Sequence, residues 1–263
     1  MRLSFVRRAG LAAPLLAGAA ALLMSAAACA QQGGTPAASS SADARGMPPL
    51  DSVLARASNS RQHGSAYAKV TLYEVSDFQC PYCKLFYDST YARFDSAYVK
   101  TGKVRMVFIN FPLPMHNQAF AASKAALCTG AQGKFWEMHD RLFQRQREWR
   151  DQPDAAQRFA RYAAELGVDS AQFRDCVQND RVSPLVVNDI MQASGAQVNS
   201  TPTLILNREK ILNGAVPYAE LAREVDALLA AAEQAAPPAG APPATTPPAA
   251  PRSSPPAAPP ARP

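Results

Sequence analysis

Hydrophobic residues along the chain change their spacing several times, and each change predicts a new element. Residues 70–75 form an apolar run that predicts a buried strand, and residues 84–99 then carry apolar side chains at helical spacing. Residues 103–111 are again almost continuously apolar, which is typical of a strand buried on both faces and parallel to its neighbour. The three segments together predict a β-α-β unit.

Helical periodicity dominates the next part of the chain, after Pro112 and Pro114. No strand pattern interrupts it, and Leu166-Gly167 followed by Val168-Asp169 marks the end of one helix and the cap of the next. The predicted helices run from Gln118 to Cys128, Lys134 to Gln146, Ala155 to Leu166, Ser170 to Gln178 and Ser183 to Ala193.

The strand pattern returns near the end of the folded region. Residues 203–207 predict a strand, 207–210 a tight turn and 211–214 its hairpin partner, and Pro217 then opens a helix to about Ala232. The pattern therefore predicts an α/β protein in which a helical insertion separates a β-α-β half from a β-β-α half.

Both ends of the chain differ in composition from this folded region. Residues 1–28 have the arginines, the acid-free Ala/Leu run and the final small residues of a bacterial export signal. Cys29 follows as a candidate lipidation site, although Ala26 stands where lipoprotein signals favour leucine. Ordinary cleavage after Ala28 or Ala30 is the alternative.

The sequence thus divides into four regions. Residues 1–28 are the signal, 29–62 a flexible spacer with a short helix that Asp51 is positioned to cap, and 63–233 the folded domain, with its insertion at about 115–197. Residues 234–263 are a Pro/Ala-rich tail that lacks large apolar side chains, so a disordered tail is predicted.

The basic net charge of the chain comes mostly from its ends. The chain carries +6 with 27 basic residues, of which three lie in the signal and two in the tail. The rest has 22 basic and 21 acidic residues, and no basic stripe that would indicate nucleic-acid binding.

Candidate chemistry lies at the junction between the first strand and its helix, where Cys80 and Cys83 are separated by two residues. The helix N-terminus stabilises a thiolate at Cys80, which lowers the cysteine pKa from about 8.5 to roughly 3.5–7.5. Pro81 suits the first helical turn. We therefore expect Cys80 to be the exposed nucleophile and Cys83 the buried thiol that resolves a mixed disulfide.

The segment Cys80-Pro81-Tyr82-Cys83 after an apolar strand, with Thr201-Pro202 before a later one, resembles the DsbA-like family of thioredoxin-fold thiol-disulfide oxidoreductases. The resemblance covers roughly Tyr67 to Ala232. It implies a thioredoxin fold with a helical insertion, no cofactor, and substrate contacts from Pro81, Tyr82, Thr201 and Pro202, with Pro202 as the cis-proline that faces the dithiol.

The resemblance also implies a role for Glu74, six residues before Cys80, as a buried acid that accepts the proton of the resolving thiol. The alternative is a strand-edge carboxylate in water. For Pro202 the alternative is an ordinary proline at the start of a strand.

Cys128 and Cys176 lie in predicted helices of the insertion. Export into an oxidising compartment favours pairing, and setting Cys29 aside leaves four cysteines. With Cys80 next to Cys83, a structural disulfide between Cys128 and Cys176 is predicted, and two separately buried thiols are the alternative.

No metal site is predicted, because His63, His116 and His139 have no spacing that suggests a shared metal. Each is interpreted as a surface or packing residue, and His116 could lie near the dithiol. Phe135, Trp136 and Phe143 are expected in the core.

These observations predict an exported thiol-disulfide oxidoreductase of the cell envelope. Its partners would be cysteine-containing exported proteins and a membrane redox partner that resets the dithiol. The resemblance to the DsbA-like family favours disulfide formation, and the sequence leaves open a reductase or isomerase. Two functions of a different kind also fit the pattern. One is a copper- or zinc-binding envelope protein that uses Cys80 and Cys83, and the second is a lipoprotein that kept the fold for binding alone.

Overall fold

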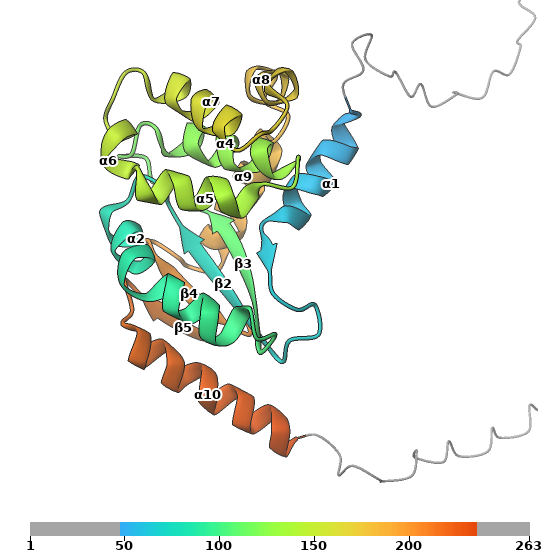
Figure 1. Cartoon of the computed structure of the whole chain (residues 1–263). Helices are drawn as coiled ribbons and strands as arrows, with labels where there is room; N and C mark the ends of the chain where they lie inside the picture. Colours follow the sequence, from blue (N-terminus) through green and yellow to red (C-terminus); the bar gives the residue numbers. More distant parts are fainter. Residues whose placement is uncertain (1–47, 236–263) are drawn as a thin grey trace, which may run out of the picture. The chain divides into compact units, whose positions relative to one another are not determined.

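The computed structural model describes residues 48–235, and its centre is a five-stranded sheet with the order β1-β3-β2-β4-β5 (Figure 1). The strands β2 (Val70–Ser76) and β3 (Val104–Asn110) are parallel, as the apolar runs predict. β4 (Thr203–Leu206) is antiparallel to β2, and β5 (Lys210–Asn213) forms a hairpin with β4. Asn207 and Arg208 have positive φ, as a tight hairpin turn requires.

The helical stretch after β2 is continuous but not uniform. It consists of α2 (Pro81–Phe86), the π-helical turn η1 (Tyr87–Tyr91), α3 (Ala92–Phe94) and a second π-helical turn η2 (Asp95–Val99). The apolar face of this stretch packs on the sheet together with α10 (Tyr218–Gln234). The core between them contains Leu72, Phe86, Phe94, Met106, Leu204 and Leu221.

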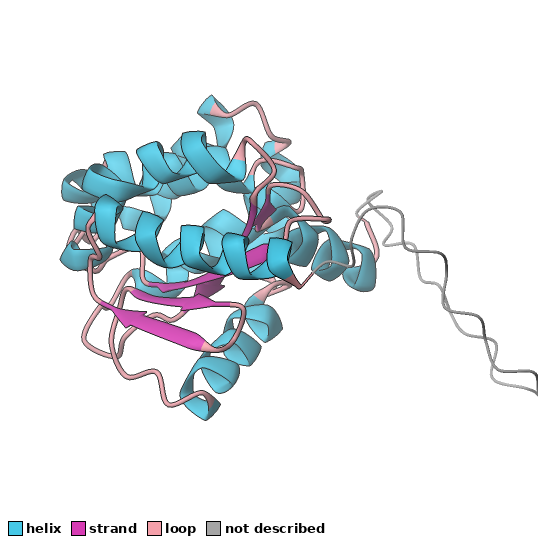
Figure 2. Ribbon diagram, turned by 90° about the horizontal axis from the view of Figure 1, so that it is seen from below, coloured by secondary structure: helices cyan, strands magenta, loops and turns pink. Residues whose placement is uncertain are grey.

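The insertion between β3 and β4 forms a helical layer at one end of the sheet (Figures 1 and 2). Within the described part of the chain it contains α4 (Ala119–Gly130), α5 (Phe135–Gln144), α6 (Gln146–Trp149), α7 (Ala155–Glu165), α8 (Ser170–Gln178) and α9 (Ser183–Gly195). The helix predicted from Lys134 to Gln146 corresponds to α5, and the short α6 that follows it was not predicted. Asp169 caps α8 by accepting the N–H groups of Ala171 and Gln172.

The folded part begins earlier than the predicted boundary at residue 63. Helix α1 (Leu50–Ser60) was expected inside a flexible spacer, yet Val53 and Ala57 are buried against the insertion. Asp51 was expected to cap this helix, but Pro49 occupies the N-cap position and Asp51 lies in the first turn. A short edge strand β1 (Gln62–His63) follows and pairs with β3; its two residues are too few for a sequence pattern.

Several predictions concern residues outside the described part. They are the signal at 1–28, the lipidation of Cys29, the first part of the spacer, and nearly all of the Pro/Ala-rich tail. Within residues 48–235, none of the helices combines the length and the hydropathy that crossing a bilayer requires.

Candidate active site

The two cysteines of the dithiol lie at the junction between β2 and α2. Cys80 is the N-cap residue of α2 with extended backbone angles, and Pro81 is the first helical residue, where a missing N–H is harmless. Cys83 lies one turn further on, and both cysteines are free thiols. The pair can therefore close into a disulfide or open again.

The pKa of Cys80 is lowered to about 6, in the direction that the sequence predicts. The main cause is a hydrogen bond from the Cys83 thiol, which outweighs the opposing effect of burial. The Thr201 side chain and the backbone N–H groups of Tyr82 and Cys83 at the helix N-terminus add to it. A large fraction of Cys80 is therefore thiolate at neutral pH.

Cys80 is less accessible than expected from the sequence. It was assigned as the exposed nucleophile, but only 4% of its surface is open to solvent, and Cys83 is fully buried. The reason is the loop before β4, since the Cys80 thiol donates a hydrogen bond to the carbonyl oxygen of Thr201 at 3.4 Å. Burial raises the pKa of Cys83, so this thiol keeps its proton while Cys80 is ionised.

Thr201 and Pro202 lie directly opposite the dithiol, although they are more than a hundred residues away in sequence. The peptide bond between them is cis, and both side chains are buried. The hydroxyl of Thr201 has no hydrogen-bond partner of standard geometry among the described residues. It lowers the pKa of Cys80, so it stabilises the thiolate.

Exposed apolar side chains lie on the helix of the dithiol and on the loop after β3. Pro81 is exposed, and Tyr82 has 63% of its surface open to solvent. Leu85 on the same helix and Met115 on the loop after β3 are also exposed. Large apolar side chains in water indicate a surface that a partner covers.

Glu74 is buried in the middle of β2, and burial raises the pKa of its carboxyl group, whereas the charge of His139 opposes this shift. No hydrogen bond joins Glu74 to Cys83 among the described residues. The Ser76 side chain instead lowers the pKa of both Glu74 and Cys83. The Ser76 hydroxyl makes no hydrogen bond of standard geometry among the described residues, but it lies near both groups. Glu74 is buried and is not a strand-edge carboxylate in water.

Asp77 organises the loop that presents the dithiol, and it is not among the site residues predicted from the sequence. Its buried carboxylate accepts the N–H groups of Gln79 at 2.7 Å and Leu113 at 2.8 Å, and contacts His116 Nδ1 at 2.6 Å. Its own N–H donates to the sulfur of Cys83 at 3.4 Å. His116 therefore contacts Asp77, the residue that orders the dithiol loop. The sequence had left open whether His116 lies near the dithiol.

Gln146 on α6 is a second site residue that was not predicted. Its side-chain amide donates to the carbonyl oxygens of Phe78 at 2.8 Å and Cys80 at 3.0 Å. Only the tertiary arrangement places this glutamine beside the dithiol, since no local pattern marks it. The helical insertion thus fixes the backbone at the nucleophile.

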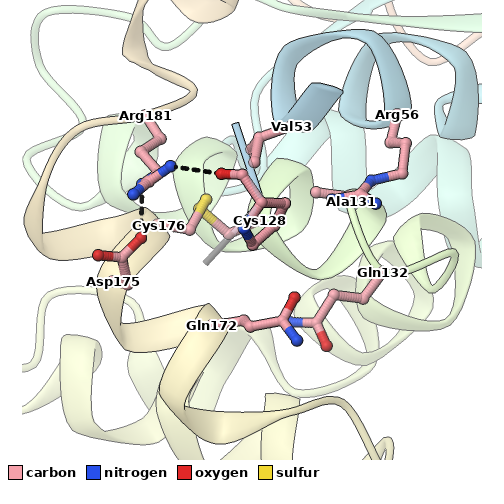
Figure 3. A pocket seen from close by; sticks show the side chains of 10 residues that line it. Val53, Arg56, Cys128, Ala131, Gln132, Gln172, Asp175, Cys176 and Arg181 are labelled. Atoms are coloured by element: carbon pink, nitrogen blue, oxygen red, sulfur yellow. Dashed lines mark hydrogen bonds and ion pairs between the residues drawn. A yellow bond between two sulfur atoms is a disulfide. The ribbon is translucent and has the colours of Figure 1, made fainter. Parts of the chain in front are cut away.

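Cys128 on α4 and Cys176 on α8 form a disulfide (Figure 3). The two sulfurs are buried and line a small pocket that α1 closes with Val53. Arg181 donates to the carbonyl oxygen of Pro48 and pairs with Asp175 at the rim. This bridge lies in the helical layer, where it joins α4 to α8.

The histidines of the described region are spread over three sites. His63 contacts Asp95, His116 contacts Asp77, and His139 is buried among aromatic rings. Phe135 and Phe143 are buried and Trp136 is partly buried, all three within the core. Between residues 48 and 235, no three His, Cys, Asp or Glu side chains converge in a way that could hold a metal ion.

A family model described as "Thioredoxin" matches residues 56–227, which is most of the described chain. The chain belongs to this thioredoxin family. The match begins within α1, so this helix is part of the family domain, in agreement with its packing.

Curated relatives fall into two groups. The chain is 34% identical over 145 residues to a Na(+)/H(+) antiporter, NhaA 3, of Salinispora tropica; the match covers 55% of this chain and 21% of the relative. The chain thus spans about a fifth of the length of that relative. It is 26% identical over 153 residues to a probable disulfide bond formation protein D of Bacillus anthracis, covering 57% of this chain and 70% of the relative.

Similar solved structures are thiol-disulfide exchange proteins. The α-DsbA1 of Wolbachia pipientis has a TM-score of 0.60 at 19% identity, covering 66% of this chain and 92% of that one. A thioredoxin-like oxidoreductase from Silicibacter pomeroyi has a TM-score of 0.53 at 24% identity, covering 72% and 100%. The resemblance to DsbA-like oxidoreductases and the thioredoxin fold with a helical insertion, both predicted from the sequence, are confirmed.

Proposed function

We propose that this chain is a protein thiol-disulfide oxidoreductase that works through Cys80 and Cys83 and favours disulfide formation. The observation that carries the proposal is that the pKa values of the two thiols are shifted in opposite directions. Cys80 has a pKa lowered to about 6, chiefly by the hydrogen bond from Cys83, whereas burial raises the pKa of Cys83. Cys80 is therefore suited to act as nucleophile or leaving group, and Cys83 stays protonated until it resolves a mixed disulfide.

The exchange is written as two displacements. A substrate thiolate attacks Cys80 in the oxidised protein, the Cys80–Cys83 bond breaks, and Cys83 leaves with the electron pair and takes up a proton. A second substrate thiolate then attacks the substrate sulfur of the mixed disulfide, so that a substrate disulfide forms and Cys80 leaves as the stable thiolate. The substrate is oxidised and the protein is reduced.

The direction follows from the stability of the reduced form. A thiolate stabilised at Cys80 favours the reduced protein and so makes the disulfide a stronger oxidant. The Cys83 thiol, Thr201 and the helix N-terminus all contribute to this stabilisation. A reductase or isomerase of the same fold would need a less stable thiolate.

The exposed residues around the dithiol fit an unfolded protein substrate. Pro81 and Tyr82 border Cys80 on one side, and Thr201 with Pro202 offers backbone to an extended chain on the other. The proposed partners are cysteine-containing exported proteins and a membrane redox partner that reoxidises the dithiol. The proposed location is the cell envelope, with residues 1–28 as the export signal and a lipid on Cys29 as membrane attachment.

The experiment that tests the proposal compares insulin reduction and the oxidative refolding of a reduced protein for wild type and two variants. Cys80→Ser is expected to fall to the uncatalysed background. Cys83→Ser is expected to accumulate a mixed disulfide with a cysteine peptide, detected by mass spectrometry, because no second sulfur resolves it. A fully active Cys80→Ser variant would contradict the proposal.

Direction is tested by equilibrating the dithiol in glutathione buffers. A reduction potential of about −120 mV for the Cys80/Cys83 couple agrees with the proposed oxidant. A value of about −270 mV would identify a reductase.

A further inference from the structure

A row of polar side chains leads away from the buried sulfur along one face of β2. Glu74 and Ser76 are two residues apart in the strand, so their side chains point to the same face of the sheet. The Ser76 side chain lowers the pKa of both Glu74 and Cys83. The Ser76 hydroxyl, like Glu74 Oε2, is buried and has no hydrogen-bond partner of standard geometry among the described residues. Both groups are therefore free to take up or pass on a proton from Cys83.

The next titratable group beyond Glu74 is His139 of α5. Glu74 pairs with Phe108 across the two parallel strands, and the His139 ring packs edge-on against Phe108 with centroids 5.3 Å apart. Both Glu74 and His139 have 1% of their surface exposed. The charge of His139 acts on the carboxyl group of Glu74, which places the two side chains in the same buried region.

The buried His139 ring contacts a partly exposed side chain, that of Asp140. Its Nδ1 atom lies 2.9 Å from the carboxylate of Asp140, whose side chain is 41% exposed. This contact makes Nδ1 the donor and leaves Nε2 as an acceptor. Neither Nε2 nor Glu74 Oε2 has a hydrogen-bond partner among the described residues, and both atoms are buried.

The surroundings of His139 exclude water and leave few other titratable groups. Seven aromatic rings have centroids within 6.5 Å of the imidazole: Phe78, Tyr87, Tyr91, Phe108, Phe135, Trp136 and Phe143. The titratable groups among the described residues around it are Glu74 on β2, Tyr87 and Tyr91 on η1, and Asp140 on its own helix. Burial raises the pKa of Tyr87 to about 12 and that of Tyr91 further, so the tyrosines stay protonated at neutral pH.

We propose that His139, oriented by Asp140, is the route by which the buried carboxyl group of Glu74 exchanges its proton with solvent during each redox cycle. This inference rests on the proposed function and adds to it a positioning pair that touches neither sulfur. Glu74 has only 1% of its surface exposed, so its proton needs neighbouring polar groups to reach water.

Protons and electrons balance when a mixed disulfide on Cys80 is resolved. The Cys83 thiol gives its proton through the Ser76 hydroxyl to the Glu74 carboxylate. The Cys83 thiolate attacks the Cys80 sulfur, the Cys80–Cys83 bond forms, and the sulfur of the redox partner that reoxidises the protein leaves with the electron pair and is reduced. Glu74 passes its proton to His139 Nε2, and the Nδ1 proton leaves through Asp140 to water.

The test follows hydrogen–deuterium exchange at the Glu74 carboxyl group by infrared spectroscopy of the reduced protein, at mildly acidic pH. The Glu74 band is the C=O stretch that is lost in Glu74→Gln, and its shift after mixing with D2O gives the exchange rate. His139→Gln is expected to slow this exchange by about 100-fold, the low end of what positioned proton transfer contributes.

Asp140→Asn is the second variant, since a substitution at the surface leaves the core intact. It is expected to slow the exchange less than His139→Gln, because the imidazole stays in place. The variant also removes a carboxylate that interacts with Tyr87. Asp88→Asn is the matched control: it removes one exposed carboxylate near the same Tyr87 without touching His139, and should keep the wild-type rate.

Wild-type exchange rates in both His139→Gln and Asp140→Asn would overturn the proposed route. Because the infrared measurement needs no substrate, its failure is distinct from the failure of the proposed function. A wild-type chain without insulin reduction or oxidative refolding would overturn the function, whatever the exchange rate at Glu74.

Discussion

At the residue scale, the site depends on a few buried polar side chains that keep Cys80 as a thiolate and Cys83 as a protonated thiol. The motif itself, the strand before it and the helix after it were visible in the sequence, because each produces a local pattern. The burial of Cys80 was not, since the loop that covers it is more than a hundred residues away at Thr201. Asp77 and Gln146 were missed for the same reason: their partners are set by tertiary contacts.

Asp77 offers a residue-scale prediction. Asp77→Ala removes the acceptor for the N–H groups of Gln79 and Leu113 and for His116. Because the Gln79 N–H is then buried without a partner and the other two donors are part-buried without one, the free energy of unfolding should fall by about 2–3 kcal/mol in urea denaturation. The exposed Asp88→Ala should stay close to wild type. Equal stability of both variants would argue against an organising role for Asp77.

At the element scale, the boundaries of helices followed their caps and prolines where the sequence contained them. The predicted helix from Ser170 to Gln178 has those bounds in α8, because Asp169 caps it. The predicted helix from Lys134 to Gln146 corresponds to α5, which ends at Arg145 without glycine or proline. The short α6 after it was not predicted, because its four residues are too few for a helical pattern. Helix α1 was assigned to a spacer because its burial depends on contacts with the insertion.

The cap of α8 gives an element-scale prediction. Asp169→Ala leaves the N–H groups of Ala171 and Gln172 without their acceptor, so stability should fall by about 1 kcal/mol in urea denaturation. Asp154→Ala is the matched control, since Asp154 holds the same position in α7 but makes no capping hydrogen bond. A loss of stability in the control equal to that in Asp169→Ala would contradict the assigned cap.

At the scale of the whole molecule, the sheet supplies the strand-to-helix junction and the insertion supplies the surroundings of the dithiol. Gln146 on α6 holds the backbone at Cys80, and His139 on α5 packs against Phe108 of β3. The stability of the helical layer therefore bears on the redox site. The sequence predicted that this layer exists, but the packing of its helices on the site follows from long-range contacts alone.

The disulfide between Cys128 and Cys176 gives a prediction at this scale. It closes a loop with a sequence separation of 48 residues, for which restriction of the unfolded chain corresponds to about 4 kcal/mol. The double variant Cys128→Ala/Cys176→Ala should therefore unfold at a lower urea concentration. Its control is Cys80→Ser/Cys83→Ser, which keeps the bridge. An unchanged midpoint in the first variant would show that the bridge does not stabilise the fold.

The central claim is that Cys80 is a thiolate at neutral pH, and its alkylation by iodoacetamide tests this most directly. The reduced protein is treated across a pH series, and mass spectrometry reports the rate at Cys80 separately from that at Cys83. Since only the thiolate reacts, the rate at Cys80 should rise with pH and reach half its maximum at about pH 6. A half-maximal rate near the ordinary cysteine value of 9.0 would contradict the account.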